Sequence, residues 1–330
     1  MPIEIVDAFK NGKAFIAFVT CGDPDLDTTA EIVRSLASNG ADLVELGIPF
    51  SDPTAEGPVI QKANVRALKA GTTTDRIFDM VASIRKDVRI PLVFMTYANV
   101  VFSYGAERFT RRCAEVGVQG LILPDVPYEE KEDFLPACRK NGIKLISMVA
   151  PTSENRISMI ASESEGFLYI VSSMGVTGTR KSISTDVGSI TEAVRKMSDT
   201  PCAVGFGIST PEQAREMSRQ ADGIIIGSAI VRMVAEHGKA SPEPVGEFAK
   251  AVKKAISDVR RSSDNRKTNV FQLKGERPTI IRHPLNKCLS IEGRTSNECR
   301  TSVFQFTVFK KKGDGGAVRG FQLWNESLTE

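Results

Sequence analysis

The amino-acid sequence predicts a (β/α)8 barrel, in which eight parallel strands alternate with helices and close into a ring. The first observation is a series of eight short apolar runs within the first 230 residues. Most of them lack polar alternation, which is typical of parallel strands that are covered on both faces. The second observation is that segments with helical spacing separate the runs, and about 250 residues is the usual length of such a barrel.

The expected strands are residues 14–20, 42–48, 91–97, 120–126, 144–150, 166–172, 201–207 and 222–228. Gly40, Gly117 and Gly142 stand where helix C-caps are expected, just before the next strand. Thr210 followed by Pro211 is typical of a helix start. A doubly wound open sheet is the alternative fold, but no G-x-G-x-x-G motif follows an early strand.

The chain divides by charge into two parts. Residues 261–330 hold 13 Lys or Arg and 7 Asp or Glu, a net charge of +6, whereas residues 1–260 carry −3. The polar stretch RRSSDNRKTN (260–269) marks the start of the second part and is typical of a linker. We therefore expect a barrel over residues 1–260 and a basic, poorly ordered C-terminal extension over 261–330. A nucleic-acid partner would need a folded basic face, which this composition does not indicate.

Composition narrows the function classes. Hydrophobic residues make up 41% and charged residues 25%, which is ordinary for a globular protein. No apolar run is long enough to span a bilayer, and the N-terminus lacks a signal-peptide pattern, so we expect a cytoplasmic protein without a membrane partner. The six cysteines form no C-x-x-C pair, and the two histidines have no metal-ligand spacing. Free thiols and no metal site are expected.

Three acids mark the second predicted strand and its loop. The active site of a barrel is built by the loops that follow the strands. Glu45 lies inside an apolar run, where a carboxylate is seldom found unless it is paired or functional. Burial would raise its pKa towards neutrality, which suits proton transfer, and the alternative is a carboxylate held by N–H groups of a loop. Asp52 fits a structural turn at least as well as catalysis, and Glu56 is either a site residue or a solvated loop acid.

Glycines after the last two strands predict a phosphate site. Gly205–Gly207 leaves one strand, and Gly227–Ser228 leaves the next strand and opens a helix. Glycines permit close approach of an anion to the backbone, and a helix N-terminus offers free N–H groups. The loop 172–185 is rich in Gly, Ser and Thr. It is interpreted as a lid with Thr177 and Gly178 near the phosphate, or as a disordered surface loop.

Six segments, taken in order, resemble the tryptophan synthase α chain family over residues 1–260. They are ELGIPFSDPTAEGPVIQKAN (45–64), YANVVFSYG (97–105), LPDVPYEE (123–130), MGVTGTR (174–180), GFGIST (205–210) and GSAIV (227–231). The resemblance implies a lyase of tryptophan biosynthesis that cleaves indole-3-glycerol phosphate to indole and glyceraldehyde 3-phosphate by retro-aldol chemistry. Chains of this family normally end near residue 260, so the extension lies outside the resemblance.

The resemblance also implies roles for individual residues. Glu45 matches the catalytic glutamate, and Glu56 falls where the family usually has an aspartate that holds the indole N–H. Tyr97 and Tyr169 match aromatic residues of the substrate pocket, and Thr177 matches a lid residue. The phosphate-binding positions match Gly178, Gly207, Gly227 and Ser228. Two residues depart from the pattern: Glu at position 56, and Ser173 where some relatives carry Arg.

Partners follow from the resemblance in the same way. It implies a β chain that receives indole and carries pyridoxal phosphate, an α2β2 heterotetramer, and no cofactor in this chain. A stand-alone indole-glycerol-phosphate lyase is an alternative, as is an inactive barrel that serves as an allosteric or structural subunit. The presence of Glu45 argues against the inactive barrel.

Overall fold

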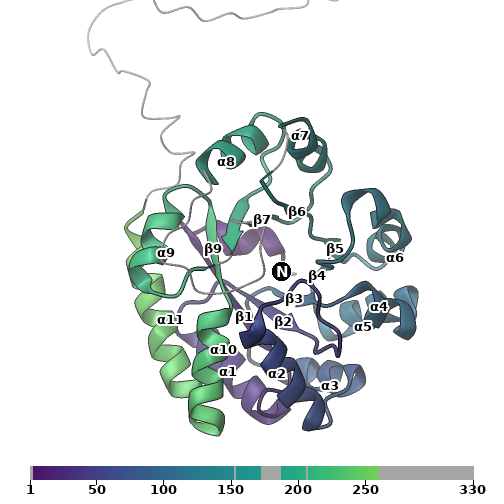
Figure 1. The fold of residues 1–330 in the computed structure, drawn as a ribbon, viewed down its shortest axis with the longest axis vertical. Coiled ribbons are helices and arrows are strands. Elements are labelled where there is room, and N and C mark those ends of the chain that lie inside the picture. The colour runs from purple at the N-terminus through teal and green to yellow at the C-terminus, as the bar shows by residue number, and fades with distance from the viewer. Residues whose placement is uncertain (1–2, 152–153, 172–186, 206, 260–330) are drawn as a thin grey trace, which may run out of the picture. The chain divides into compact units, whose positions relative to one another are not determined.

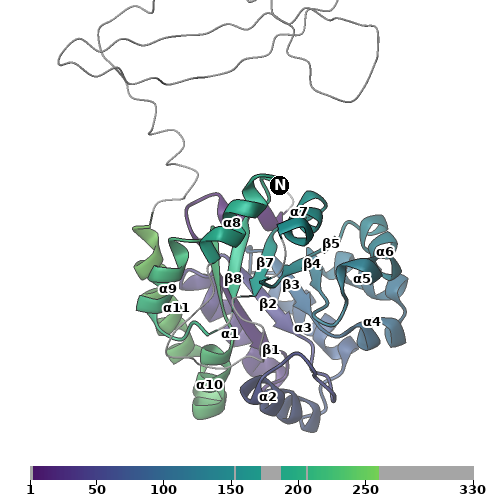
Figure 2. The same ribbon diagram turned by 45° about the horizontal axis from the view of Figure 1, so that its top comes forward.

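The structure is a computed structural model that describes residues 3–151, 154–171, 187–205 and 207–259. Helices surround a central set of parallel strands (Figures 1 and 2). The strands are β1 (Ala14–Thr20), β2 (Leu43–Gly47), β3 (Leu92–Met95), β4 (Gly120–Ile122), β5 (Lys144–Leu145), β6 (Met148–Val149), β7 (Leu168–Val171), β8 (Cys202–Gly205) and β9 (Gly223–Ile226). Every one of them lies within a predicted run.

The sheet closes through the run predicted at 144–150. The strand order is β5-β4-β3-β2-β1-β9-β8-β7-β6, so β5 and β6 stand at the two ends of the order. They are nevertheless halves of one run, separated by Ile146 and Ser147. Ile146 donates its N–H to Leu121 at 2.9 Å, and Ser147 accepts from the N–H of Tyr169 at 3.0 Å. One segment thus pairs first with β4 and then with β7, which completes the predicted (β/α)8 barrel.

The helices follow the strands as predicted. They are α1 (Leu26–Ser38), α2 (Pro58–Lys69), α3 (Thr74–Ile84), α4 (Ala98–Tyr104), α5 (Ala106–Val116), α6 (Leu135–Lys140), α7 (Glu154–Ser162), α8 (Val187–Arg195), α9 (Pro211–Ser218), α10 (Ser228–His237) and α11 (Pro242–Ser257), with 3-10 helices η1 (Ile5–Phe9), η2 (Tyr128–Asp133) and η3 (Gly238–Ala240). Gly117 ends α5 in the left-handed conformation with φ 78°. The Thr210 side chain accepts from the Gln213 N–H at the start of α9, so the helix start predicted at Thr210 and Pro211 is confirmed.

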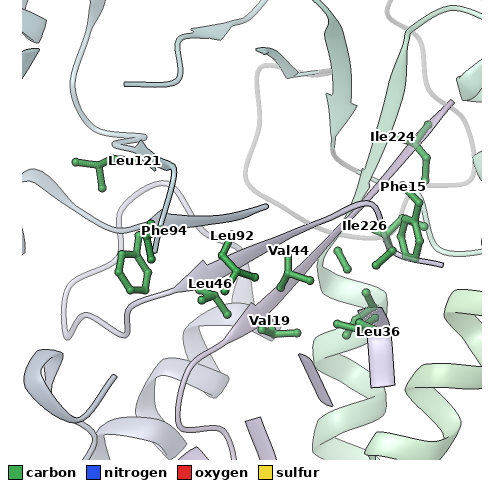
Figure 3. Packing of buried hydrophobic residues seen from close by; sticks show 14 of the residues in the cluster. Phe15, Val19, Leu36, Val44, Leu46, Leu92, Phe94, Leu121, Ile224 and Ile226 are labelled. Atoms are coloured by element: carbon green, nitrogen blue, oxygen red, sulfur yellow. The ribbon is translucent and has the colours of Figure 1, made fainter. Parts of the chain in front are cut away.

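The strands bury both of their faces, which explains their continuous apolar sequence. Side chains such as Phe15, Val44 and Phe94 point outward and pack under the helices (Figure 3). The inward-facing cluster includes Ile16 and Leu43, together with residues of η1. Because η1 packs into the interior from the amino-terminal side, the carboxyl ends of the strands are left for the site.

Predictions about membrane spans, cysteines and the two outlying segments differ in whether the structure can test them. No helix in the described ranges is long and apolar enough to cross a membrane. Four cysteines within those ranges are buried free thiols, as predicted: Cys21, Cys113, Cys138 and Cys202. The extension over 261–330 and the loop 172–185 lie outside the described residues, so their predicted order and role stay predictions.

Candidate active site

Glu45 lies on β2 inside the barrel. In the sheet register it stands between Phe18 of β1 and Val93 of β3, and by strand alternation it faces the same way as interior Leu43. The residue is 0% exposed, and neither carboxylate oxygen has a hydrogen-bond partner in the part of the chain that the structure describes. Burial raises the pKa of this carboxyl to about 8. Within that part of the chain, the alternative of a carboxylate held by loop N–H groups is therefore not supported.

Tyr169 of β7 shares this interior with Glu45. Burial raises the pKa of the Tyr169 hydroxyl above its usual range, and the negative charge of Glu45 raises it further. Gly205 of β8 leaves the space that the ring occupies: a Cβ at this position would lie 2.4 Å from the Tyr169 hydroxyl oxygen. Gly205 was predicted as part of the phosphate turn, but its contact in the structure is with this aromatic ring.

Glu56 stands immediately before Gly57, the N-cap of α2, and it is half-buried. One of its oxygens, Oε2, accepts a hydrogen bond from the Asn64 side-chain amide at 2.7 Å. Burial raises the pKa of the Glu56 carboxyl to about 7, and the bond from Asn64 lowers it in part. The alternative of a fully solvated loop acid is therefore not supported by the contacts of Glu56.

The Glu56 loop is fastened to the end of β3 by Tyr97. This tyrosine is 3% exposed, and its hydroxyl accepts the Ala55 N–H at 2.9 Å. Its ring stacks on Phe50 with 5.2 Å between ring centroids. Burial raises its pKa, and the charge of Glu56 adds to that shift. Asp52 is exposed and accepts from the hydroxyl of its neighbour Ser51, in keeping with a turn role.

The predicted phosphate positions lie at the ends of neighbouring strands β8 and β9. Gly207 has a φ of +86°, a conformation that glycine adopts without strain. Gly227 is the N-cap of α10 and Ser228 is its first residue. The first N–H groups of a helix have no partner within the helix, so this turn offers donors to an anion. Thr177, Gly178 and Ser173 lie outside the described residues.

Comparison with known proteins identifies the family. The family model described as "Tryptophan synthase alpha chain" matches residues 6–260. The chain belongs to this family. A tryptophan synthase alpha chain from Lacticaseibacillus casei is 46% identical over 260 residues, which are 79% of this chain and 98% of that relative.

Solved structures of the family share the fold. The chain resembles tryptophan synthase from Mycobacterium tuberculosis with a TM-score of 0.70 and 30% identity, over 78% of this chain and 99% of that one. It also resembles a tryptophan synthase complex from Pyrococcus furiosus with a TM-score of 0.66 and 29% identity, over 73% and 98% of the two chains. The predicted family, barrel and lyase activity in tryptophan biosynthesis are confirmed.

Two further residues of this tryptophan synthase α chain lie near the site and were not predicted from the sequence. Thr20 ends β1 and is 3% exposed, and its hydroxyl has no partner within the described ranges. A hydroxyl at the carboxyl end of an apolar run is a signal that sequence reading could have used. Asn64 was missed because its contact with Glu56 depends on how α2 turns back over its own loop. No cluster of three His, Cys, Asp or Glu able to hold a metal occurs in the described ranges.

Proposed function

We propose that this chain cleaves indole-3-glycerol phosphate at the carboxyl end of its barrel, with Glu45 as the group that moves protons. The observation that supports this assignment is the carboxyl itself. It is fully buried, has no hydrogen-bond partner in the described ranges, and has a pKa of about 8. A purely structural acid at such a position would be expected to bring hydrogen-bond donors with it, because a buried charge without them is costly.

The chemistry needs one acid and one base in sequence. With a pKa of about 8, Glu45 is mostly protonated near pH 7 and can give its proton to indole C3. The resulting carboxylate then takes the proton of the hydroxyl on the carbon attached to the ring. The bond between indole C3 and the hydroxyl-bearing carbon then breaks, and its electron pair returns to the ring. The hydroxyl-bearing carbon becomes the aldehyde of glyceraldehyde 3-phosphate. Glu45 ends the cycle protonated, so atoms and charge balance.

Glu56 stabilises the ring during this cycle. Protonation at C3 places positive charge on the ring nitrogen, and a carboxylate that accepts the indole N–H interacts most strongly at that moment. An interaction that strengthens in the transition state lowers the barrier rather than merely tightening binding. Tyr97, which positions the Glu56 loop, and Tyr169, beside Glu45, line the substrate pocket.

The phosphate is held at the carboxyl ends of β8 and β9. Gly207, Gly227 and Ser228 provide backbone N–H groups and the N-terminus of α10, and Thr177 and Gly178 complete the site from the loop 172–185. Support comes from the positive φ of Gly207 and from the helix start at Ser228. These positions follow β8 and β9, which are the seventh and eighth strands of the barrel because β5 and β6 count as one. Phosphate commonly binds after these two strands in this fold.

The partner of this chain is a tryptophan synthase β chain, in an α2β2 heterotetramer in the cytoplasm. The likeness to a tryptophan synthase complex supports a β-chain partner. Indole leaves at the barrel mouth, so the β chain docks around residues 52–54 and 99–100, among which Asp52, Thr54 and Asn99 are exposed. Pyridoxal phosphate belongs to the β chain, and this chain needs no cofactor of its own.

The decisive experiment measures indole release by the purified chain, alone and with a β chain. Glu45→Gln keeps the size of the side chain but cannot transfer a proton, so at least about 100-fold of the rate should be lost. Binding of glyceraldehyde 3-phosphate, measured by calorimetry, should persist. Wild-type turnover in Glu45→Gln would overturn the assignment, and an unchanged rate on adding β chain would overturn the partnership.

A further inference from the structure

The inner face of α2 carries one polar side chain that packing does not require. Ile60, Ala63 and Ala67 are buried on this face, and Ile60 and Ala63 pack with Phe18 of the barrel. Asn64 lies among them and is only 4% exposed. Burying an amide in apolar surroundings costs free energy unless it is hydrogen-bonded. An apolar residue would fill the same space without that cost, so Asn64 calls for another explanation.

The hydrogen-bond partner of Asn64 is the Glu56 carboxylate. The bond from Asn64 Nδ2 to Glu56 Oε2 is 2.7 Å long, which is within the short range of charge-assisted bonds. It occupies a single oxygen. The other oxygen, Oε1, accepts no hydrogen bond from any residue that the structure describes. One end of the carboxylate is fixed, and the other is left for a donor such as an indole N–H.

Helix α2 is a firm base for this contact. Arg66 binds both oxygens of Asp23 at 2.8 and 2.7 Å, and Asp23 is itself 2% exposed in the loop after β1. The Gln61 side chain donates to the main-chain oxygen of Glu56 at 2.8 Å. Residue 56 is therefore held by the same helix at its backbone and at its carboxylate.

We propose that Asn64 is a positioning residue for Glu56, fixing one carboxylate oxygen so that the other meets the indole N–H and favouring the ionised form. This rests on the proposed role of Glu56. A glutamate has one more rotatable bond than the aspartate usual at this position, and holding a flexible side chain in one conformation costs entropy. The hydrogen bond from Asn64 orders the Glu56 side chain before substrate binds, so less entropy is lost on binding. It also stabilises negative charge, so losing it makes the carboxylate harder to ionise.

The test compares Asn64→Leu with Gln61→Ala in the full-length chain. Asn64→Leu keeps the volume and removes the donor, whereas Gln61→Ala removes the bond to the Glu56 backbone and leaves the carboxylate pair intact. We expect Asn64→Leu to lower kcat/KM about ten- to a hundredfold, the usual size of a lost hydrogen bond to a charged group. The acid limb of its pH profile should move to higher pH. Gln61→Ala should leave that limb in place.

Two further measurements distinguish a wrong role for Asn64 from a wrong role for Glu56. Glutamate carboxyls labelled with carbon-13 allow Glu56 to be titrated by NMR, with Glu56→Gln assigning the signal, and its pKa should rise in Asn64→Leu. In the Glu56→Gln background, Asn64→Leu should add less than about threefold, because the charged bond is already lost. If Asn64→Leu cannot be purified folded, Asn64→Ala replaces it in each measurement.

The outcomes are distinct. An unchanged Glu56 titration and pH limb in Asn64→Leu, with Glu56→Ala nearly inactive, would refute the positioning role and leave the proposed function standing. Wild-type kcat in Glu56→Ala would instead refute the role of Glu56 itself. A rise in the Glu56 pKa together with a displaced acid limb supports the inference.

Discussion

The two acids of the site are held in different ways. Glu45 projects from the middle of β2, between two paired strands, and its oxygens have no partner within the described ranges. Glu56 belongs to the loop before α2 and is held by Asn64. Burial raises the pKa of both. The strand positions its carboxyl through the rigid barrel alone, whereas the loop needs a bonded neighbour to achieve the same precision.

Shortening each acid by one methylene tests this difference directly and gives the largest expected effect. Glu45→Asp withdraws the carboxyl by about 1.5 Å, and the paired strand cannot follow it. We expect a loss of about 100-fold in kcat, since small misplacement of a catalytic group is this costly. Glu56→Asp should stay within about tenfold of wild type, because aspartate keeps the charge and is the residue usual at this position in the family that the sequence resembles. Steady-state cleavage of indole-3-glycerol phosphate measures both variants, and equal losses would break the comparison.

The pH dependence of stability tests the raised pKa of Glu45 next. The folded pKa of Glu45, about 8, lies above its ordinary value of 4.5. Its contribution to the free energy of unfolding is therefore fully present below about pH 4.5 and is lost as pH rises to about 8. The loss is bounded by about 1.4 kcal/mol per unit of pKa difference. Urea unfolding of wild type and Glu45→Gln at pH 5 and pH 8.5 should show wild type losing more stability, and parallel curves would contradict the assignment.

Much of this comparison could be read from the sequence, and its limits are physical. The strands were predictable because both faces of each are buried, and Glu45 stood out as an acid in the middle of an apolar run. The split at Ile146 and Ser147 was not predictable, because it depends on closure between β4 and β7. The Glu56–Asn64 bond depends on the packing of α2 over the barrel mouth. Such contacts join residues whose spacing in the sequence carries no signal.

Gly205 offers a test on the strand side of the site. Tyr169 pairs with Ala203 in the sheet, so Gly205 is its diagonal neighbour on the same face. A methyl group there would lie 2.4 to 2.8 Å from the hydroxyl oxygen and two ring carbons of Tyr169. We expect Gly205→Ala to lower kcat about tenfold by displacing the ring beside Glu45, within the range for small misplacements.

A second substitution decides whether that clash is the cause. Tyr169→Phe keeps the two crowded ring carbons and should not restore Gly205→Ala. Tyr169→Leu removes the ring and should restore part of the activity in the double variant, although it lowers activity alone. Indole release by wild type, Gly205→Ala, Tyr169→Leu and their double variant gives the interaction between the two positions. If the two losses simply add, Gly205 acts at some other contact, such as the phosphate turn in which it was first predicted.

The smallest expected effect lies on the loop side, at Tyr97. Tyr97→Phe removes the hydroxyl that accepts the Ala55 N–H and keeps the ring stacked on Phe50. A lost neutral hydrogen bond is worth about 1 kcal/mol, so we expect roughly a fivefold change. Because the bond positions the Glu56 loop and not β2, kcat/KM should fall while the titration of Glu45 stays unchanged. Tyr104→Phe is the matched control, since its hydroxyl donates to Asp75 on α3. Equal effects of the two variants would mean that the Tyr97 bond only stabilises the fold, and a shifted Glu45 titration would mean that loop and strand are not independent.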